Sequence, residues 1–172
     1  VLGVPMIAMT QRLHHMAFRC RDSEETRLFY EEVIGLPLAA ALPIEASATG
    51  RAVRVMHTFF QLRDGSFVAF FEVPDAPFEF KEQHDFDLHM ALEADQEGID
   101  RAVAAAKARG LEVRGPSEHG FIRSTYFRDP NGYVVELALK THIHDSFEAE
   151  AAKAAHAILA AWRARNAELA GA

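Results

Sequence analysis

The chain has 172 residues, an apolar content of 49% and a formal net charge of −7. This length suits one domain or two small modules that share a core. The acidic balance and the lack of a basic stripe argue against nucleic acid as a partner, and the apolar runs are too short to span a membrane. The lone Cys20 excludes an internal disulfide, and residues 1–11 form an apolar lead-in without the basic start of a signal peptide. We therefore expect a cytoplasmic protein.

Residues 12–73 have the pattern of a strand, a helix and three more strands. His14–Cys20 alternates in polarity as a strand does. Asp22 or Ser23 has the chemistry of a helix N-cap, and Gly35 is typical of a helix end. The three further strands are expected over residues 36–46, 53–62 and 66–73.

The same order recurs after a linker over residues 74–85, so residues 86–140 form a second module. Asp95 and Gly110 bound its helix. Its strands are expected over residues 86–94, 124–128 and 133–140, with another strand that starts over residues 111–114. Two sequence matches support a repeat: His-Met-Ala-Phe from His15 matches His-Met-Ala-Leu from His89, and Arg-Asp-Gly from Arg63 matches Arg-Asp-Pro-Asn-Gly from Arg128. We predict an α+β fold of two tandem βαβββ modules.

Residues 141–172 form a C-terminal extension without a counterpart in the first module. The segment from His144 to about Leu169 is helical by composition, and large apolar residues recur along one face of it. Such a face should cover the sheet or a partner subunit, so we expect a homodimer.

The repeat places three metal-ligating side chains at matching positions. In a strand, alternate residues share a face, so His15 lies with Ala17 and Arg19, and opposite the apolar side that should meet the helix. His89 has the same place in the second module, and Glu136 has the matching place in its last strand. Two imidazoles and a carboxylate are a suitable ligand set for a divalent metal, because a facial arrangement leaves positions open for water, substrate or dioxygen.

Each of these side chains also has a simpler interpretation. A histidine on a strand is more often hydrogen-bonded than metal-bound, and a lone Glu136 would usually face solvent. The repeat equivalence of the two histidines favours the metal. His14 competes with His15 as a ligand, and the alignment of His89 with His15 favours His15.

These residues resemble a known family. The paired modules, the histidines that open them, Phe29-Tyr30 before a Gly-Leu pair, and the Asp-Pro-Asn-Gly turn followed by Glu136 are similar to the vicinal oxygen chelate superfamily. That superfamily includes glyoxalase I, fosfomycin and bleomycin resistance proteins, methylmalonyl-CoA epimerase and extradiol dioxygenases. The resemblance covers roughly residues 12–140, and it implies an eight-stranded, bowl-shaped sheet around the metal.

The resemblance is nearest to the extradiol branch. Glyoxalase-like members usually carry a fourth ligand on the last strand of the first module, where this chain has Ala69. Three ligands, two His and one Glu, imply Fe(II). The extradiol signature is matched by His119, Tyr126, the Asp-Pro-Asn-Gly turn and Glu136, although Thr125 departs from the usual apolar residue.

The resemblance also implies residue roles. Tyr126 would hydrogen-bond or protonate a substrate oxygen, and His57 or His119 would serve as the acid/base. His57 shares the parity of Gln61 on its strand and could therefore face the metal, although a bulge would turn it to solvent. The family's catalytic histidine on the first module is absent from Gly65-Ser66-Phe67, which leaves the acid/base open between these two. The expected substrate-binding residues are Arg19, Phe59, Gln61, Phe67 and Phe121. Arg19 has an alternative partner in Glu93, at the equivalent position of the second module.

The leading hypothesis is thus an Fe(II) dioxygenase of a small aromatic, catechol-like substrate. One alternative is a metal-dependent isomerase, lyase or epimerase that uses Mn, Ni, Co, Mg or Zn and needs no dioxygen. Another is a binding or resistance protein that holds a small aromatic ligand without turnover.

Overall fold

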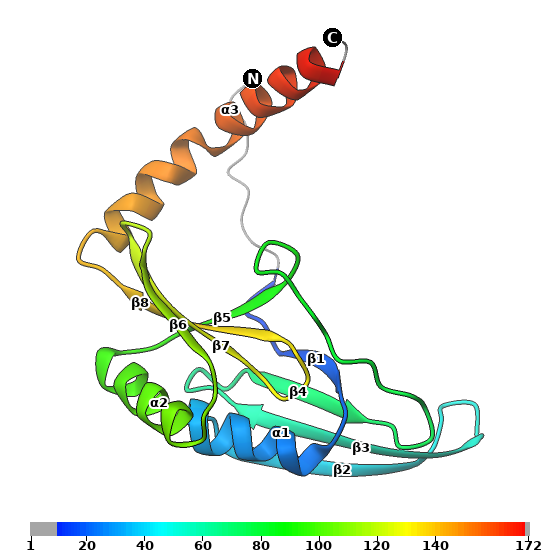
Figure 1. The fold of residues 1–172 in the computed structure, drawn as a ribbon. Coiled ribbons are helices and arrows are strands. Elements are labelled where there is room, and N and C mark those ends of the chain that lie inside the picture. Colours follow the sequence, from blue (N-terminus) through cyan, green and yellow to red (C-terminus); the bar gives the residue numbers. More distant parts are fainter. Residues whose placement is uncertain (1–9, 171–172) are drawn as a thin grey trace.

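The computed structural model describes residues 10–170, so most of the apolar lead-in lies outside it (Figure 1). It confirms the α+β fold of two βαβββ modules followed by a helix. The first module consists of β1 (His15–Cys20), α1 (Ser23–Phe29), the π-helical segment η1 (Tyr30–Ile34), β2 (Leu38–Ala46), β3 (Ala52–Gln61) and β4 (Phe67–Glu72). The second consists of β5 (His89–Glu93), α2 (Gln96–Ala108), β6 (Val113–Glu118), β7 (Ile122–Arg128) and β8 (Val134–Lys140), and α3 (His144–Ala170) follows it.

The eight strands form two separate four-stranded sheets of identical topology. The strand orders are β1-β4-β3-β2 and β5-β8-β7-β6, with a parallel pair at one edge of each sheet. Ala17 pairs with Ala69 in the first sheet, and Ala91 pairs with Glu136 in the second. The register therefore confirms that Ala69 and Glu136 occupy equivalent positions.

Local chemistry sets the helix boundaries as predicted. The Asp22 and Asp95 side chains accept hydrogen bonds from the backbone N–H groups of Glu25 and Gly98, each 2.8 Å or shorter. Gly35 ends the first helical segment at a φ of 85°, a left-handed conformation that favours glycine.

Two strand boundaries differ from prediction. β5 begins only at His89, because residues 85–87 form a turn in which Phe86 is exposed. β6 begins at Val113, two residues later than expected, and continues to Glu118. Its pairing with β7 shifts register between Arg114 and Ser117, around Pro116, and alternation in the sequence does not reveal a strand interrupted by a proline.

The core lies between the two sheets and joins both modules. Tyr133 packs on Phe18 with ring centroids 5.0 Å apart, and both sheets present their helix-facing sides to one apolar cluster. Its buried members include Cys20, Phe29, Tyr30, Phe60 and Phe70 from the first module, and Met90, Phe127, Val135 and Leu137 from the second. Burial raises the pKa of the Cys20 thiol to about 11, which fits a small core side chain. On the opposite sheet faces, His15 and His89 are exposed, whereas Glu136, His57 and Ala69 are buried.

The Asp129-Pro-Asn-Gly132 turn connects the modules. Asp129 and Asn131 are buried, and the backbone N–H of Arg21 donates to Asn131 Oδ1 at 2.8 Å. Gly132 has a φ of 96°, and a Cβ there would lie 2.1 Å from the carbonyl oxygen of Lys81. A turn that the sequence marks as an ordinary hairpin is thus a packed contact between distant segments.

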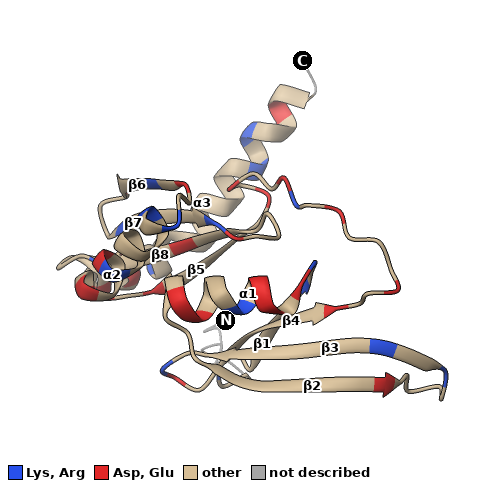
Figure 2. Cartoon of the chain, turned by 60° about the horizontal axis from the view of Figure 1, so that its bottom comes forward, with Lys and Arg blue, Asp and Glu red and all other residues tan. Residues whose placement is uncertain are grey.

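Charges are unevenly distributed over the fold. Figure 2 shows them concentrated on α1, α2 and the loop before β5, while the long β2–β3 hairpin is mostly uncharged. No helix within residues 10–170 is long and apolar enough to cross a membrane.

The C-terminal helix is confirmed, but its expected cover within the chain is not found. Figure 1 shows α3 extending away from both sheets. Ile158 and Trp162, on the apolar face, are 64% and 58% exposed. Of the two expected covers, the chain's own sheet or a partner subunit, the first is not formed, because α3 packs on the sheet only at its start.

Candidate metal centre

Glu136 and His89 meet on the outer face of the second sheet. Glu136 lies on β8 and His89 on the neighbouring edge strand β5, and His89 Nε2 is 3.2 Å from Glu136 Oε2. The Ser124 hydroxyl donates to Glu136 Oε1 at 2.5 Å. Glu136 is only 3% exposed, and a buried carboxylate needs a compensating cation or proton. These donors therefore fit a divalent metal.

The imidazole of His89 is held in the orientation that a metal ligand needs. Its Nδ1 lies 2.6 Å from the backbone carbonyl of Asp85, and this contact makes Nδ1 the protonated nitrogen and leaves the Nε2 lone pair toward Glu136. The Asp85 side chain accepts two hydrogen bonds from Arg114, at 2.9 and 3.0 Å. The Arg114 guanidinium holds the pKa of Asp85 below its ordinary value. Arg114 and Asp85 thus brace the backbone that positions His89.

Tyr126 and His119 extend this group. Tyr126 is the direct neighbour of Glu136 in the β7–β8 pairing. Its hydroxyl lies 3.2 Å from His119 Nε2, and the Arg114 guanidinium lies over its ring, 5.3 Å from the centroid. The structure therefore brings two predicted catalytic residues together beside a predicted ligand.

Sequence reasoning missed three residues of this group: Asp85, Arg114 and Ser124. Ser124 shares the parity of Tyr126 on β7, so alternation could have found it. Asp85 ends a segment that we interpreted as a linker, and nothing local to it signals its contact with Arg114.

His15 lies apart from His89 and Glu136. Its Nδ1 is 2.8 Å from His14 Nδ1, and its ring lies 5.8 Å from that of Phe59 on the first sheet. Within residues 10–170, one set of three potential ligands has its donor atoms within 4.8 Å of one another, and that set does not include His15. A single chain therefore assembles two of the three predicted ligands.

His57 faces the same side of the first sheet as His15, as its parity predicted. The two rings are 6.5 Å apart, and His57 stacks on Phe71 at 3.6 Å and 13°. Its Nδ1 contacts the carbonyl of Phe70 at 3.0 Å. Gln61 and Phe67, opposite one another in the β3–β4 pairing, lie on the same side. This face of the first sheet thus carries histidine and aromatic side chains.

Two other predicted residues are engaged elsewhere. The expected Arg19–Glu93 pair is not formed: Arg19 donates to the carbonyl of Ala76 at 3.4 Å, and Glu93 pairs with Lys140 at 3.1 Å. The reason is that the two outer faces do not meet in one chain. Phe121 stacks on Phe147 of α3 at 4.2 Å, so its ring is occupied outside the His89–Glu136 group.

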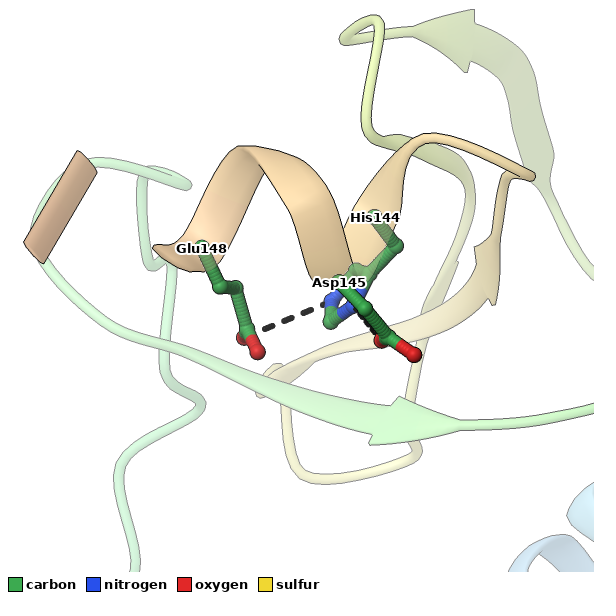
Figure 3. Close-up of side chains that lie close together, drawn as sticks. All are labelled: His144, Asp145 and Glu148. Atoms are coloured by element: carbon green, nitrogen blue, oxygen red, sulfur yellow. Dashed lines mark hydrogen bonds and ion pairs between the residues drawn. The ribbon is translucent and has the colours of Figure 1, made fainter. Parts of the chain in front are cut away.

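The set of three close ligand-type residues is at the start of α3 (Figure 3). Both ring nitrogens of the buried His144 face carboxylates, Asp145 at 3.0 Å and Glu148 at 3.5 Å. Both acids are exposed, and the contacts join residues within one turn of the helix. We interpret this group as an anchor of the helix start.

Two cavities lie beside the helices. One, of about 430 Å³, lies between the start of α1 and the β2–β3 strands, and another, of about 390 Å³, lies between α2 and β6–β7. Neither is lined by His15, His89 or Glu136. On the outer faces of the sheets, His15 and His89 are exposed.

Comparison with known proteins identifies the family. A model of the Glyoxalase/Bleomycin resistance protein/Dioxygenase superfamily matches residues 12–137. The chain belongs to this superfamily. Its members share the paired-module fold, and the superfamily includes metal-dependent enzymes and resistance proteins. Among curated proteins, none matches the chain.

Solved structures of the superfamily have a similar fold. A glyoxalase/dioxygenase from Nostoc punctiforme is 25% identical, with 83% of this chain and 99% of that chain covered and a TM-score of 0.59. The fosfomycin resistance protein FosX from Mesorhizobium loti is 26% identical, covering 82% and 99%, with a TM-score of 0.57. A FosX from Listeria monocytogenes in complex with Mn(II) and a dihydroxypropylphosphonic acid is 22% identical, covering 78% and 96%, with a TM-score of 0.55, and shows the fold alone.

Proposed function

We propose that the protein is an Fe(II) extradiol-type dioxygenase of a catechol-like aromatic substrate. The observation that carries the proposal is the Tyr126–His119 contact of 3.2 Å, one strand away from Glu136 and on its face of the sheet. A hydroxyl and an imidazole at this separation can hold a substrate oxygen and move its proton. The superfamily relationship supplies the expectation of a metal beside them.

The metal would be held by His15, His89 and Glu136. When bound, Fe(II) supplies a Lewis acid that lowers the pKa of the substrate hydroxyls and a redox centre for dioxygen. The chain's own residues do the rest: Tyr126 orients a substrate oxygen, His119 or His57 accepts its proton, and Asp85 fixes the His89 tautomer.

A second copy of the chain would complete the ligand set. β1 and β5 are edge strands, and His15 and His89 on them are exposed. We propose a homodimer in which β1 of one copy lies beside β5 of the other, so that His15 joins His89 and Glu136 across the interface. The aromatic face around His57 and Phe59 would then enclose the substrate.

The nature of these faces favours a ring over an anion. A phosphonate, such as the ligand in the Listeria structure, needs uncommitted cations. Here Arg114 is paired with Asp85 and Lys140 with Glu93, and in the described part of the chain Arg19 alone of these three cations contacts no acid, only the carbonyl of Ala76. The first sheet offers aromatic side chains instead, with the Phe59 and Phe67 rings 5.8 Å apart. A metal-dependent isomerase or lyase remains the rival within the superfamily.

Anaerobic reconstitution tests the reaction. Protein loaded with Fe(II) and mixed with a panel of catechols in air should produce a yellow ring-fission chromophore, and protein loaded with Mn, Ni, Co, Mg or Zn tests the rival reactions without dioxygen. Tyr126→Phe should retain its metal content and lose about 10²–10⁴-fold in kcat. No chromophore with any catechol, or undiminished turnover by this variant, would contradict the dioxygenase proposal.

Subunit complementation tests the shared site. His15→Ala and His89→Ala should each be inactive alone. Mixed and reassembled, they should recover about one quarter of the wild-type sites, since half of the dimers are mixed and each holds one intact site. Metal content gives the same count independently of activity. No recovery in verified mixed dimers would show that the three ligands come from one chain.

A further inference from the structure

The helix α3 carries an exposed apolar stripe along its length. The helix has 27 residues, so it extends about 40 Å. Ile158, Trp162 and Leu169 on this stripe are 64%, 58% and 67% exposed. The whole stripe consists of Phe147, Ala151, Ala155, Ile158, Trp162 and Leu169.

The start of the helix is fixed, so the stripe cannot fold freely onto the sheets. Phe147 stacks on Phe121 with an interplanar angle of 6°. The Thr141 hydroxyl donates to the carbonyl of Gly120 at 2.9 Å, and its backbone N–H donates to that of Phe121 at 3.0 Å. These contacts with the β6–β7 turn direct the helix outward (Figure 1).

The charges beside the stripe differ between its two ends. Glu148 and Glu150 flank its first half, and Arg163 and Arg165 flank its second half; Figure 2 shows charged bands of both signs on α3. Within the described chain, the ion pairs of the acids are local, with His144 at 3.5 Å and Lys153 at 2.6 Å. The helix is therefore complementary to itself only when the two copies run in opposite directions.

We propose that α3 pairs antiparallel with α3 of a second copy of this chain. An antiparallel pair centred near His156 places Trp162 against Ala151 of the second copy and Ile158 against Ala155. Each large side chain then meets a small one, as close helix packing requires.

The same register aligns the charges. Arg163 lies opposite Glu148 of the second copy, and Arg165 lies opposite Glu150. In a parallel pair, acids would face acids and arginines would face arginines, which is unfavourable. The charge pattern thus selects both the partner and its direction. The proposal involves no metal and no reaction, so it is independent of the proposed function.

Intrinsic fluorescence offers a direct test, because Trp162 is the only tryptophan of the chain. Dilution of the intact protein should shift its emission to the red as α3 pairs separate. The double variant Glu148→Arg/Glu150→Arg should move this transition to at least about 10-fold higher protein concentration, since four ion pairs become repulsive contacts. Adding Arg163→Glu/Arg165→Glu to this double variant should return the transition to the wild-type concentration. Lys153→Glu, on the opposite side of the helix, is the matched control.

Cysteine pairing tests the direction. Glu150→Cys and Arg165→Cys proteins, oxidised separately, should give little covalent dimer. An equal mixture of the two should give a disulfide-linked dimer, and a mixture of Lys153→Cys with Arg165→Cys should not. Strong linkage of each variant with itself would show a parallel pair and overturn the proposal. The proposal would also be overturned if the Trp162 emission wavelength changed with anionic vesicles but not with protein concentration or charge reversal.

Discussion

The Tyr30 hydroxyl donates a hydrogen bond to Asp129 Oδ2 at 3.1 Å, and the two residues are 99 positions apart in the sequence. Tyr30 is fully buried in the first module, and Asp129 opens the turn between β7 and β8 of the second. The bond links the two modules at the turn that precedes Glu136. It therefore connects the stability of the core with the position of the candidate metal centre.

Removal of this hydroxyl should destabilise the fold. Tyr30→Phe keeps the ring in the core but leaves the buried Asp129 with one donor fewer, so the free energy of unfolding should fall by about 1–3 kcal/mol. Urea denaturation measures the change. Tyr126→Phe, at a half-buried site on the outer face, is the control and should change stability by less than about 0.5 kcal/mol. Equal effects of the two substitutions would contradict the linking role of Tyr30.

The turn itself gives a second prediction through Gly132. Gly132→Ala combines a positive φ with a Cβ that would lie 2.1 Å from Lys81 O. Gly110→Ala is the matched control, because Gly110 also has a positive φ, of 67°, but has nothing within 4 Å. We expect Gly110→Ala to cost about 1–2 kcal/mol and Gly132→Ala to cost more than about 4 kcal/mol or to abolish folding. Thermal unfolding of both variants checks this difference, and similar costs would show that the loop at Lys81 yields easily.

Asp129 should make stability depend on pH. Burial is the main influence on this carboxyl and raises its pKa above the ordinary 3.8, although hydrogen bonds from Asn131, Tyr133 and Tyr30 partly oppose it. Between 3.8 and the higher folded-state pKa, the folded protein binds more protons than the unfolded chain. This group's contribution to stability therefore falls as pH rises through that window.

Asp129→Asn isolates this contribution, because the amide does not titrate. The difference in unfolding free energy, wild type minus variant, should be largest below pH 3.8 and should decrease as pH rises above it. Urea denaturation of both proteins at several pH values from 3 to 7 measures it. A difference that does not vary with pH would mean that burial has not shifted this carboxyl.

The sequence was sufficient for the modules and for half of the site. Repeated short matches revealed two equivalent units, and strand parity placed His89 with Glu136 and His57 with His15, because both arguments depend on neighbours within a strand or a repeat. The separation of His15 from His89 depends on how the sheets pack, which parity does not contain. Asp85 was missed for a related reason: its role comes from Arg114, on a strand reached only after α2.

The Glu136 carboxylate should lower the free energy of unfolding of the metal-free protein. Glu136→Gln preserves the shape and can still accept from Ser124, but it removes a buried charge whose polar neighbours are the Ser124 hydroxyl and the His89 imidazole. We expect metal-free Glu136→Gln to be more stable than the wild type by about 1–3 kcal/mol.

Metal should offset that difference in stability. Co(II) at about 100 times its dissociation constant should stabilise the wild type by about 2.7 kcal/mol and leave Glu136→Gln unchanged. Thermal unfolding with and without Co(II) measures both effects. If the variant is less stable without metal, the Glu136 carboxylate contributes to the fold in its own right, and the ligand assignment loses its main support.

Arg114 should act on the metal without touching it. Its two hydrogen bonds to Asp85 hold the backbone whose carbonyl binds His89 Nδ1, so Arg114→Gln should free the imidazole to rotate and lower Co(II) affinity by about 10–100-fold. Arg114→Lys, which offers one contact in place of two, should give an intermediate affinity. Arg101→Gln, which removes an exposed pair with Glu97, is the control and should leave affinity unchanged. Co(II) titration followed by visible absorption gives the affinities, and unfolding measurements show whether stability has changed. Loss of affinity only in proportion to loss of stability would mean that Arg114 supports the fold and not the orientation of His89.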